Sequence, residues 1–189
     1  SISETISNLN LVYNSAGISG LGNENISITN TGTITATQIN DLLGETSGTI
    51  TVVGSGNLAI TMTSGQTLDL SGITNSLSGN LTIEDSAGNE NITGTSVNDT
   101  LTLSSGNDTV NLGDGSDVIN VTIGNLDISD NISDNGVSGT DTLNITNSGT
   151  IDSANLIDVN GIETLNLSAS DDTITFDDTT EFNAFRNEF

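Results

Sequence analysis

Four acidic residues follow one another at intervals of nine positions in the middle of the chain. They are Glu90, Asp99, Asp108 and Asp117. Carboxylates repeated at a fixed interval fall at equivalent places in a repeating structure, where they repel one another unless a cation lies between them. Only one of the 189 residues, Arg186, is basic, against 25 acidic residues, so basic side chains cannot supply that cation. The spacing therefore indicates sites for metal ions.

The composition excludes several kinds of chemistry and of partner. The chain contains no cysteine and no histidine, so it has no disulfides, no cysteine or histidine ligands for zinc and no histidine-dependent catalytic triad. Its net charge of −24 makes nucleic acids and anionic membranes poor partners, and no run of residues is suited to membrane insertion. Enzymes on parallel β-helices need paired acids and usually a basic residue in a groove. Arg186, near one terminus, fits that role poorly, so we expect no enzymatic activity.

Residues 76–138 can be written as seven consecutive frames of nine residues. The fourth and fifth positions are mostly Gly and Asn, which favour turns, so each frame is predicted to form a turn followed by a very short strand. The low hydrophobicity and high charge are also typical of disorder, but the period favours a thin-cored β structure. The eighth positions, which we expect to form the core, are Ile83, Ile92, Leu101, Val110, Ile119, Ile128 and Val137.

The best-preserved stretch, residues 104–121, reads SSGNDTVNLGDGSDVINV. It contains GNDTV at 106–110 and GDGSDVI at 113–119, and VNDTL, one frame before the first of these, is a weaker match. These segments resemble the RTX family of calcium-binding nonapeptide repeats, whose unit is Gly-Gly-x-Gly-x-Asp-x-apolar-x. The first two glycines of this unit are mostly missing, since only Gly94 holds the first position and Gly113 the second.

The resemblance implies a parallel β-roll in which two nonapeptides complete one coil. Residues two frames apart in the sequence then lie one strand spacing apart, about 4.8 Å. Asp99 stacks on Asp117 in such a roll, and Glu90 stacks on Asp108 at the opposite edge. Ca²⁺ takes about six to eight oxygen ligands, which stacked turns supply from carboxylates and backbone carbonyls. The resemblance therefore implies that several Ca²⁺ ions bind between the turns.

Further candidate ligands lie in the turn at 113–117 and beyond it. Asn135 stands two frames after Asp117 and offers an amide oxygen to a third site. Asp114 offers its carbonyl or faces water, and for Asp172, as for Asp141, a solvated turn is at least as good an interpretation. The complete set of additional candidates is Gly113, Asp114, Gly115, Asn135 and Asp172.

Both flanks are predicted to continue the solenoid. TQINDLL, at 37–43, is the only plausible helical turn, and ITNTGTITATQINDL at 28–42 is similar to ITNSGTIDSANLIDV at 145–159. Strands at irregular spacing before the repeats are indicated by the apolar pairs Ile26 and Ile28, Ile50 and Val52, Leu58 and Ile60, and Leu68 and Leu70.

The predicted fold is an all-β, right-handed parallel β-solenoid with a central RTX-type β-roll. A terminal coil exposes unpaired strand edges and needs a cover, which the Phe-rich end of the chain can provide. We expect three parts: a solenoid flank with irregular coils at 1–75, RTX-like calcium-binding nonapeptide repeats at 76–138, and further β coils with a C-terminal cap or docking segment at 139–189.

The expected function is that of an extracellular structural surface protein, such as an S-layer subunit, a filament subunit or an adhesin stalk, whose folding and self-assembly depend on Ca²⁺. The alternative is a binding module of a large secreted RTX adhesin for cells, glycans or ice, although the Thr spacing is not regular, as an ice-binding face would require. The resemblance implies type I secretion to the bacterial cell surface. Expected partners are further copies of the chain or a cell-surface polysaccharide.

Overall fold

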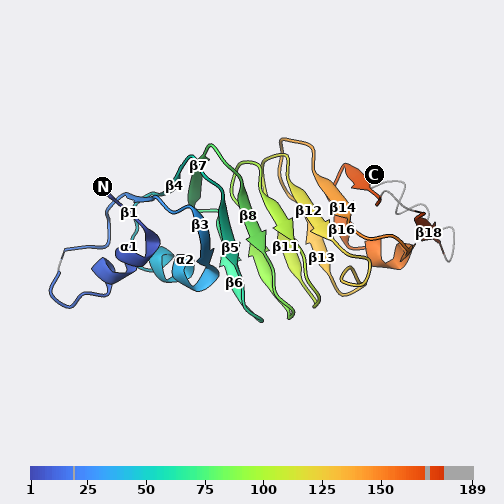
Figure 1. The fold of residues 1–189 in the computed structure, drawn as a ribbon, viewed down its shortest axis with the longest axis horizontal. Helices are drawn as coiled ribbons and strands as arrows, with labels where there is room; N and C mark the ends of the chain where they lie inside the picture. Colours follow the sequence, from blue (N-terminus) through green and yellow to red (C-terminus); the bar gives the residue numbers. More distant parts are fainter. Residues whose placement is uncertain (19, 169–170, 177–189) are drawn as a thin grey trace.

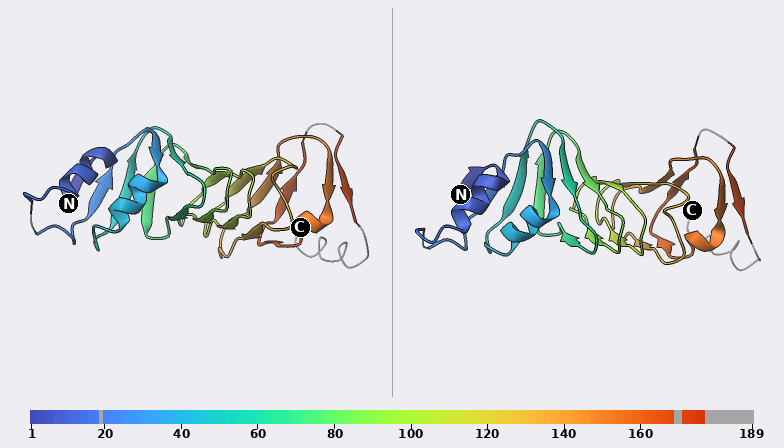
Figure 2. Two further views of the ribbon diagram at one scale, coloured as in Figure 1. Left: turned by 90° about the horizontal axis from the view of Figure 1, so that it is seen from below. Right: turned by 60° about the horizontal axis from the view of Figure 1, so that its bottom comes forward.

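The computed structural model describes residues 1–18, 20–168 and 171–176, which form an elongated solenoid (Figure 1, Figure 2). Every strand pairing between described residues is parallel. Successive coils stack along the long axis, so the sequence runs from one end of the rod towards the other (Figure 1). This architecture confirms the predicted all-β parallel solenoid.

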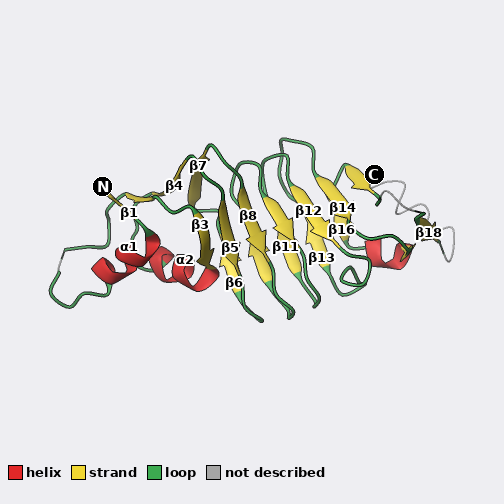
Figure 3. Cartoon of the chain, in the orientation of Figure 1, coloured by secondary structure: helices red, strands yellow, loops and turns green. Residues whose placement is uncertain are grey.

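The strands of the described residues form four sheets (Figure 3). Sheet A contains β1 (Ile2–Glu4), β2 (Ile26–Ile28), β4 (Ile50–Gly54) and β7 (Ile73–Leu77). Sheet B contains β3 (Gly32–Thr35), β5 (Leu58–Thr61), β8 (Leu81–Glu84), β10 (Thr100–Thr102), β12 (Val118–Val121), β14 (Thr142–Ile145) and β17 (Thr164–Asn166). Sheet C contains β6 (Thr67–Asp69), β9 (Asn91–Thr93), β11 (Thr109–Asn111), β13 (Asn131–Ser133) and β16 (Val159–Asn160), and sheet D contains β15 (Thr150–Asp152) and β18 (Thr173–Thr175).

The cross-section of the rod changes along its length. The third and fourth coils pass through sheets A, B and C in turn, as β4, β5 and β6 and then as β7, β8 and β9. Sheet A ends at β7, and sheet D begins only at β15, so the coils between them have only sheets B and C. We call the regular part of this two-sheet segment, residues 91–121, the roll. Within it the coil shortens to two frames, since Thr100 pairs with Thr82 on one side and with Val118 on the other.

The predicted nine-residue period holds only as far as β12. Thr109 pairs on one side with Asn91, two frames before it, but on the other side with Asn131 instead of Asp127, which stands two frames after it. The extra residues lie in the segment between β12 and β13, where Leu126 is buried. Ile128 and Val137, which we expected in the core, are 60% and 93% exposed, so the last two predicted frames are wrong. An insertion in one coil shifts every later residue off a fixed period.

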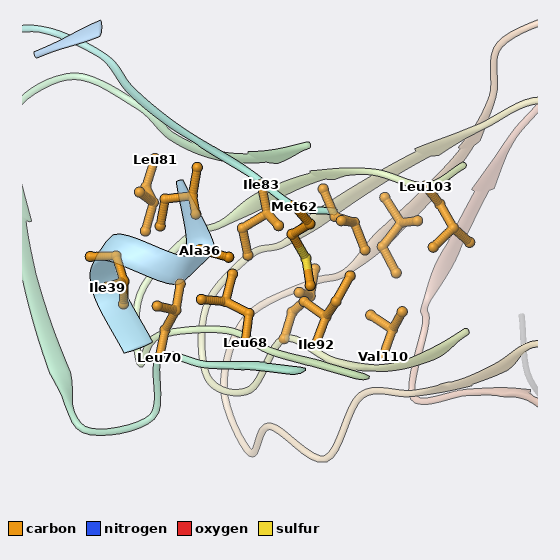
Figure 4. Close-up of a cluster of buried hydrophobic side chains, with 14 of the residues drawn as sticks. Ala36, Ile39, Met62, Leu68, Leu70, Leu81, Ile83, Ile92, Leu103 and Val110 are labelled. Carbon is orange, nitrogen blue, oxygen red and sulfur yellow. The ribbon is translucent and has the colours of Figure 1, made fainter. Parts of the chain in front are cut away.

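The core is one continuous column of aliphatic side chains. The eighth positions of the five regular frames, Ile83, Ile92, Leu101, Val110 and Ile119, are at most 1% exposed. Figure 4 shows Ile83, Ile92 and Val110 in the same cluster as side chains of earlier coils such as Leu68 and Leu70. Alternate residues of each strand face inward because side chains of a β-strand alternate between its two faces.

Two helices take the place of sheet C in the first coils. Helix α1 (Ile6–Tyr13) packs against α2 (Ala36–Leu43), and α2 packs against β6. Helix α2 confirms the predicted helical turn, whereas α1 was not predicted, although Ile6 and Leu9 lie on one helical face and Thr5 caps it. In the described part of the chain no helix is long and apolar enough to cross a membrane.

The two similar segments of the sequence have similar structures. Residues 32–43 form β3 and then α2, and residues 150–156 form β15 and then the 3₁₀ helix η1 (Ser153–Leu156). The residue between strand and helix caps the helix in both, since Thr35 accepts a hydrogen bond from Gln38 N and Asp152 accepts one from Ala154 N. The repeated phrase therefore encodes a strand that turns into a capped helix.

Replacing Thr35 by alanine is expected to destabilise the N-terminal coils by about 0.5 to 2 kcal/mol. The hydroxyl accepts from Gln38 N at 3.2 Å while Gln38 Oε1 accepts from Thr35 N at 3.0 Å, and alanine removes the first of these bonds. Chemical denaturation at saturating Ca²⁺ measures the change. Thr35→Ser keeps the hydroxyl and is the control, so equal midpoints for the two variants would contradict the assigned cap.

Candidate metal centres

Two ladders of acidic residues run along opposite edges of the rod, through the roll and beyond it. In each ladder every acid immediately precedes a strand, and every carboxylate after the first accepts a hydrogen bond from the backbone N–H of the equivalent acid one coil earlier. The ladder before the sheet B strands comprises Asp99, Asp117, Asp141 and Glu163, with N···O distances of 2.7, 2.8 and 2.8 Å. The ladder before the sheet C strands comprises Glu90, Asp108 and Asp130, with distances of 2.9 and 3.0 Å. The predicted stacking of Asp99 with Asp117 and of Glu90 with Asp108 is confirmed.

One cluster of carboxylates lies at the edge where sheet B leads into sheet C. Asp85, Glu90 and Asp108 each place one carboxylate oxygen so that the three atoms lie within 4.8 Å of one another. Asp108 is 0% and Glu90 2% exposed. One oxygen of each residue is buried without a hydrogen-bond partner, namely Asp85 Oδ1, Glu90 Oε2 and Asp108 Oδ2. We call this group the first cluster.

A second cluster lies at the opposite edge, where sheet C leads back into sheet B. Asp117, Asp134 and Asp141 also place oxygens within 4.8 Å of one another, and all three side chains are buried. Asp117 Oδ2 and Asp134 Oδ2 have no hydrogen-bond partner. Asp99 lies one coil before Asp117 and belongs to neither three-carboxylate group, but its Oδ1 is likewise buried and unpaired.

Burial raises the pKa of several of these carboxyl groups above its ordinary value. The pKa of Asp108 and of Asp117 is raised from 3.8 to about 7, chiefly by loss of solvent and to a lesser extent by neighbouring carboxylates, against the opposing effect of backbone N–H donors. Loss of solvent likewise raises the pKa of Asp85 and of Asp99 to about 6. It also raises the pKa of Asp134, whose carboxylate is further disfavoured by Glu163. The fold therefore brings together acids that strongly favour a positive charge or a proton.

The donor set fits Ca²⁺. All the unpaired atoms of the two clusters are carboxylate oxygens, which hard cations prefer, and no thiolate or imidazole is present to favour zinc. A buried polar atom without a partner costs about 1 to 3 kcal/mol, and more when it is charged, so a cation bound there would stabilise the fold directly. An ion at the first cluster would be held by Asp85, Glu90 and Asp108, and one at the second by Asp117, Asp134 and Asp141.

The predicted turn residues Gly113 and Gly115 lie beside the second cluster. Gly113 N donates to Asp134 Oδ1 at 3.0 Å. Gly115 has a φ of +149°, and a Cβ atom on it would lie 2.7 Å from Asp117 Oδ1, so a larger residue would displace that carboxylate. Asp114 is half-buried and its Oδ1 accepts from Val137 N at 2.7 Å, which ties two turns together.

The structure does not bring Asn135 or Asp172 to either cluster. Strand β12 pairs with β14 so that Val118 lies beside Thr142, which places Asp141 rather than Asn135 next to Asp117, and the expected stacking of Asn135 is wrong. Asn135 is exposed and its amide donates to Ser133 O. Asp172 accepts from Gly149 N and from Ser168 Oγ with its two oxygens, as expected of a turn residue.

Asp85 and Asp134 are the two cluster residues that the sequence analysis did not consider, whereas Asp141, for which a solvated turn was at least as good an interpretation, lies in the second cluster. Asp85 and Asp134 both follow a strand directly, at the position where the RTX unit has its first glycine. Asp85 is the first residue of a nine-residue frame. In the pairing of β11 with β13, Asp134 falls opposite Leu112, which is the first residue of another frame. The signal was therefore an acid at a glycine position, recognisable for Asp85 from the frame. For Asp134 the frame itself was out of register.

Comparison with known proteins identifies one family. The model of the RTX calcium-binding nonapeptide repeat (4 copies) matches residues 85–119. The matched segment contains the whole first cluster together with Asp99 and Asp117, whereas Asp134 and Asp141 lie beyond it. Neither the curated proteins nor the solved structures gave a significant match.

Proposed function

Because residues 85–119 are RTX repeats, which bind Ca²⁺ and indicate a secreted protein, we propose that this chain is a structural protein of the bacterial cell surface whose rod is held together by Ca²⁺. In this proposal it is a subunit of a surface layer or filament, or part of an adhesin stalk, and it reaches the surface by type I secretion. The observation that carries the proposal is the set of buried, unpaired carboxylate oxygens on both edges of the roll.

The two-sheet segment explains why Ca²⁺ would control the fold. Sheet A ends at β7, so the coils of the roll lack a third sheet and have a thinner core, while the turns that replace it carry buried acids. Without a cation these acids oppose folding, since an unpaired buried charge is costly. With Ca²⁺ the same groups join neighbouring coils. Binding free energy thereby becomes folding free energy, which suits a protein that must stay unfolded until it is outside the cell.

The surface supports a structural role rather than a catalytic one. A depression of about 300 Å³ is lined by Asn75, Leu77, Gly79, Asn80, Val97 and Asn98, none of which is an acid or a base. The clustered acids lie in turns at the edges of the rod, where each accepts from a backbone N–H group, and of the six only Asp85 lines a second depression, of about 200 Å³. Such groups are arranged to hold ions and not to meet a large substrate.

A second candidate function, that of a binding module in an adhesin, is favoured by the outer face of sheet B. Thr82, Thr100, Thr142 and Thr164 occupy one row of this face, interrupted by Val118, although their spacing in the sequence is irregular. In the next row Asn144 Nδ2 donates to Asn120 Oδ1 at 3.0 Å, and Asn166 Nδ2 donates to Asn144 Oδ1 at 2.9 Å. An ordered polar face of this kind suits contact with a glycan or another hydrated surface.

A calcium titration of the EDTA-stripped chain tests both candidates. We expect far-UV circular dichroism to show a gain of β structure as Ca²⁺ reaches millimolar concentration, because the ions pair the buried carboxylates. Light scattering on the same samples separates the candidates: growth into large assemblies supports the structural protein, and a lasting monomer supports the binding module. Mg²⁺ at the same concentration is the control for the circular dichroism and scattering signals. If neither signal changes on addition of Ca²⁺, the proposal is refuted.

A further inference from the structure

Each cluster contains one carboxylate that comes from outside the two ladders. Asp85 directly follows β8 and Asp134 directly follows β13, so both stand at the start of a turn, whereas the ladder acids stand at its end. The RTX unit has glycine at this first position, which can offer an ion only backbone atoms. The two residues are therefore additions to the repeat and not copies of its conserved acid.

Both side chains are held by one oxygen and present the other. Asp85 Oδ2 accepts a hydrogen bond at 2.9 Å from the backbone N–H of Ser104, which lies in the following coil. Asp85 Oδ1 is buried without a hydrogen-bond partner. Asp134 Oδ1 accepts from Gly113 N at 3.0 Å, in the preceding coil, and from Gly136 N at 3.1 Å, while its Oδ2 is buried without a partner. Asp134 as a whole is 9% exposed. Backbone donors thus fix one oxygen of each carboxylate and leave the other buried without a partner, within a group whose carboxylates approach one another to within 4.8 Å.

The two clusters lie at opposite ends and on opposite edges of the roll. The first cluster follows β8, in the last coil that contains a strand of sheet A. The second cluster surrounds the connection from β13 to β14, and β14 leads into β15, the first strand of sheet D. Each cluster therefore lies where the two-sheet segment meets a coil that contains a strand of a further sheet.

We propose that Asp85 and Asp134 are the third carboxylate ligands of two Ca²⁺ sites that close the two ends of the roll. The inference rests on the proposed function, since it assigns particular ligands to the Ca²⁺ that folds the rod. Each site offers the ion three carboxylates, and Ca²⁺ affinity rises with the number of charged ligands and with the rigidity of the site. Within the described residues these two sites are accordingly the tightest.

The test uses Asp85→Asn and Asp134→Asn, singly and together, with Asp158→Asn as the matched control. Asp158 is exposed and belongs to neither cluster. Its substitution by asparagine removes one negative charge, as each single variant does, but leaves both clusters intact. Isothermal titration calorimetry with CaCl₂ on the full chain should show two tight sites in the native protein and in the control. Each single variant should lose one of them, with affinity at that site reduced on the order of tenfold or more, and the double variant should lose both.

Hydrogen exchange at limiting Ca²⁺ locates each loss. Asp85→Asn should deprotect β9 and β11, beside the first cluster, and Asp134→Asn should deprotect β12 and β14, beside the second. Asp85→Gly, which restores the glycine of the repeat, should behave as Asp85→Asn and guards against an effect of the amide itself. If the native chain folds with Ca²⁺ but these variants titrate like the control, the assignment of the two ligands is wrong. If the native chain does not respond to Ca²⁺, the proposed function fails first.

Discussion

Replacing Asp108 and Asp117 together by asparagine is expected to change stability in opposite directions with and without Ca²⁺. Both side chains are at most 1% exposed and have an unpaired oxygen. Asparagine keeps the acceptor that Asp108 offers to Glu90 N and that Asp117 offers to Asp99 N, but it removes a buried charge. The Ca²⁺-free fold should gain about 1 to 2 kcal/mol per site, after allowance for solvent screening. The additional stability that Ca²⁺ confers should largely disappear, because each cluster loses a charged ligand.

Urea denaturation in EDTA and in saturating CaCl₂ measures both effects. A variant carrying Glu84→Gln and Asp158→Asn is the control, since it loses the same two charges from exposed positions. It should change little in either condition and should keep its Ca²⁺ response. Equal changes in the free energy of unfolding in EDTA for the buried and the exposed double variants would mean that the gain comes from the lower net charge alone. The argument from burial would then be wrong.

Acidification should stabilise the Ca²⁺-free protein. Loss of solvent raises the pKa of Asp85 and Asp99 to about 6 and that of Asp108 and Asp117 to about 7, from an ordinary value of 3.8. The folded chain therefore holds these protons to higher pH than the unfolded chain does. Their contribution to stability is complete below about pH 4 and is lost as the pH rises through about 6 to 7. Saturating Ca²⁺ should reverse the trend, since the ion needs the ionised carboxylates and releases their protons on binding.

Thermal denaturation in EDTA at pH 5 and pH 8, repeated in CaCl₂, measures this reversal. Added NaCl separates the clusters from general repulsion within a chain of net charge −24, because salt screens exposed charges far more than buried ones. The pH effect in EDTA should persist at high salt. Equal melting temperatures at the two pH values under that condition would show that the buried acids are ionised without penalty.

The sequence was most informative where the coils are regular. Ile83 to Ile119 hold a strict period, and from it the core, the strands and the stacking of Glu90 with Asp108 could be predicted. The prediction failed at Asn135, because the segment between β12 and β13 and the turn before β14 add residues that no fixed period can locate. Pairing across such loops depends on which apolar side chains reach the core, as Leu126 does in place of Ile128.

The third ligands and the first helix were missed for different reasons. Asp134 becomes close to Asp117 only through the irregular coil, so its role depends on a contact that spacing does not encode. Asp85, in contrast, stands in a regular frame at a glycine position and could have been recognised as an acid in the wrong place. Helix α1 has a capping Thr5 and buried Ile6 and Leu9, but this local signal is short and was outweighed by the β pattern that surrounds it.

The buried acids are unevenly distributed along the rod. Among the described residues, none of the buried charged side chains precedes Glu90, and the N-terminal coils are closed by three walls of strands or helices around an apolar core. Those coils have no electrostatic reason to come apart when Ca²⁺ is withdrawn, whereas the roll does. Without Ca²⁺ the N-terminal coils would then stay folded, while the roll would become a flexible, unfolded segment. Adding Ca²⁺ back would refold the roll into a shorter and more rigid segment. The Ca²⁺ concentration would thereby set the distance and the relative orientation of the coils on either side of the roll.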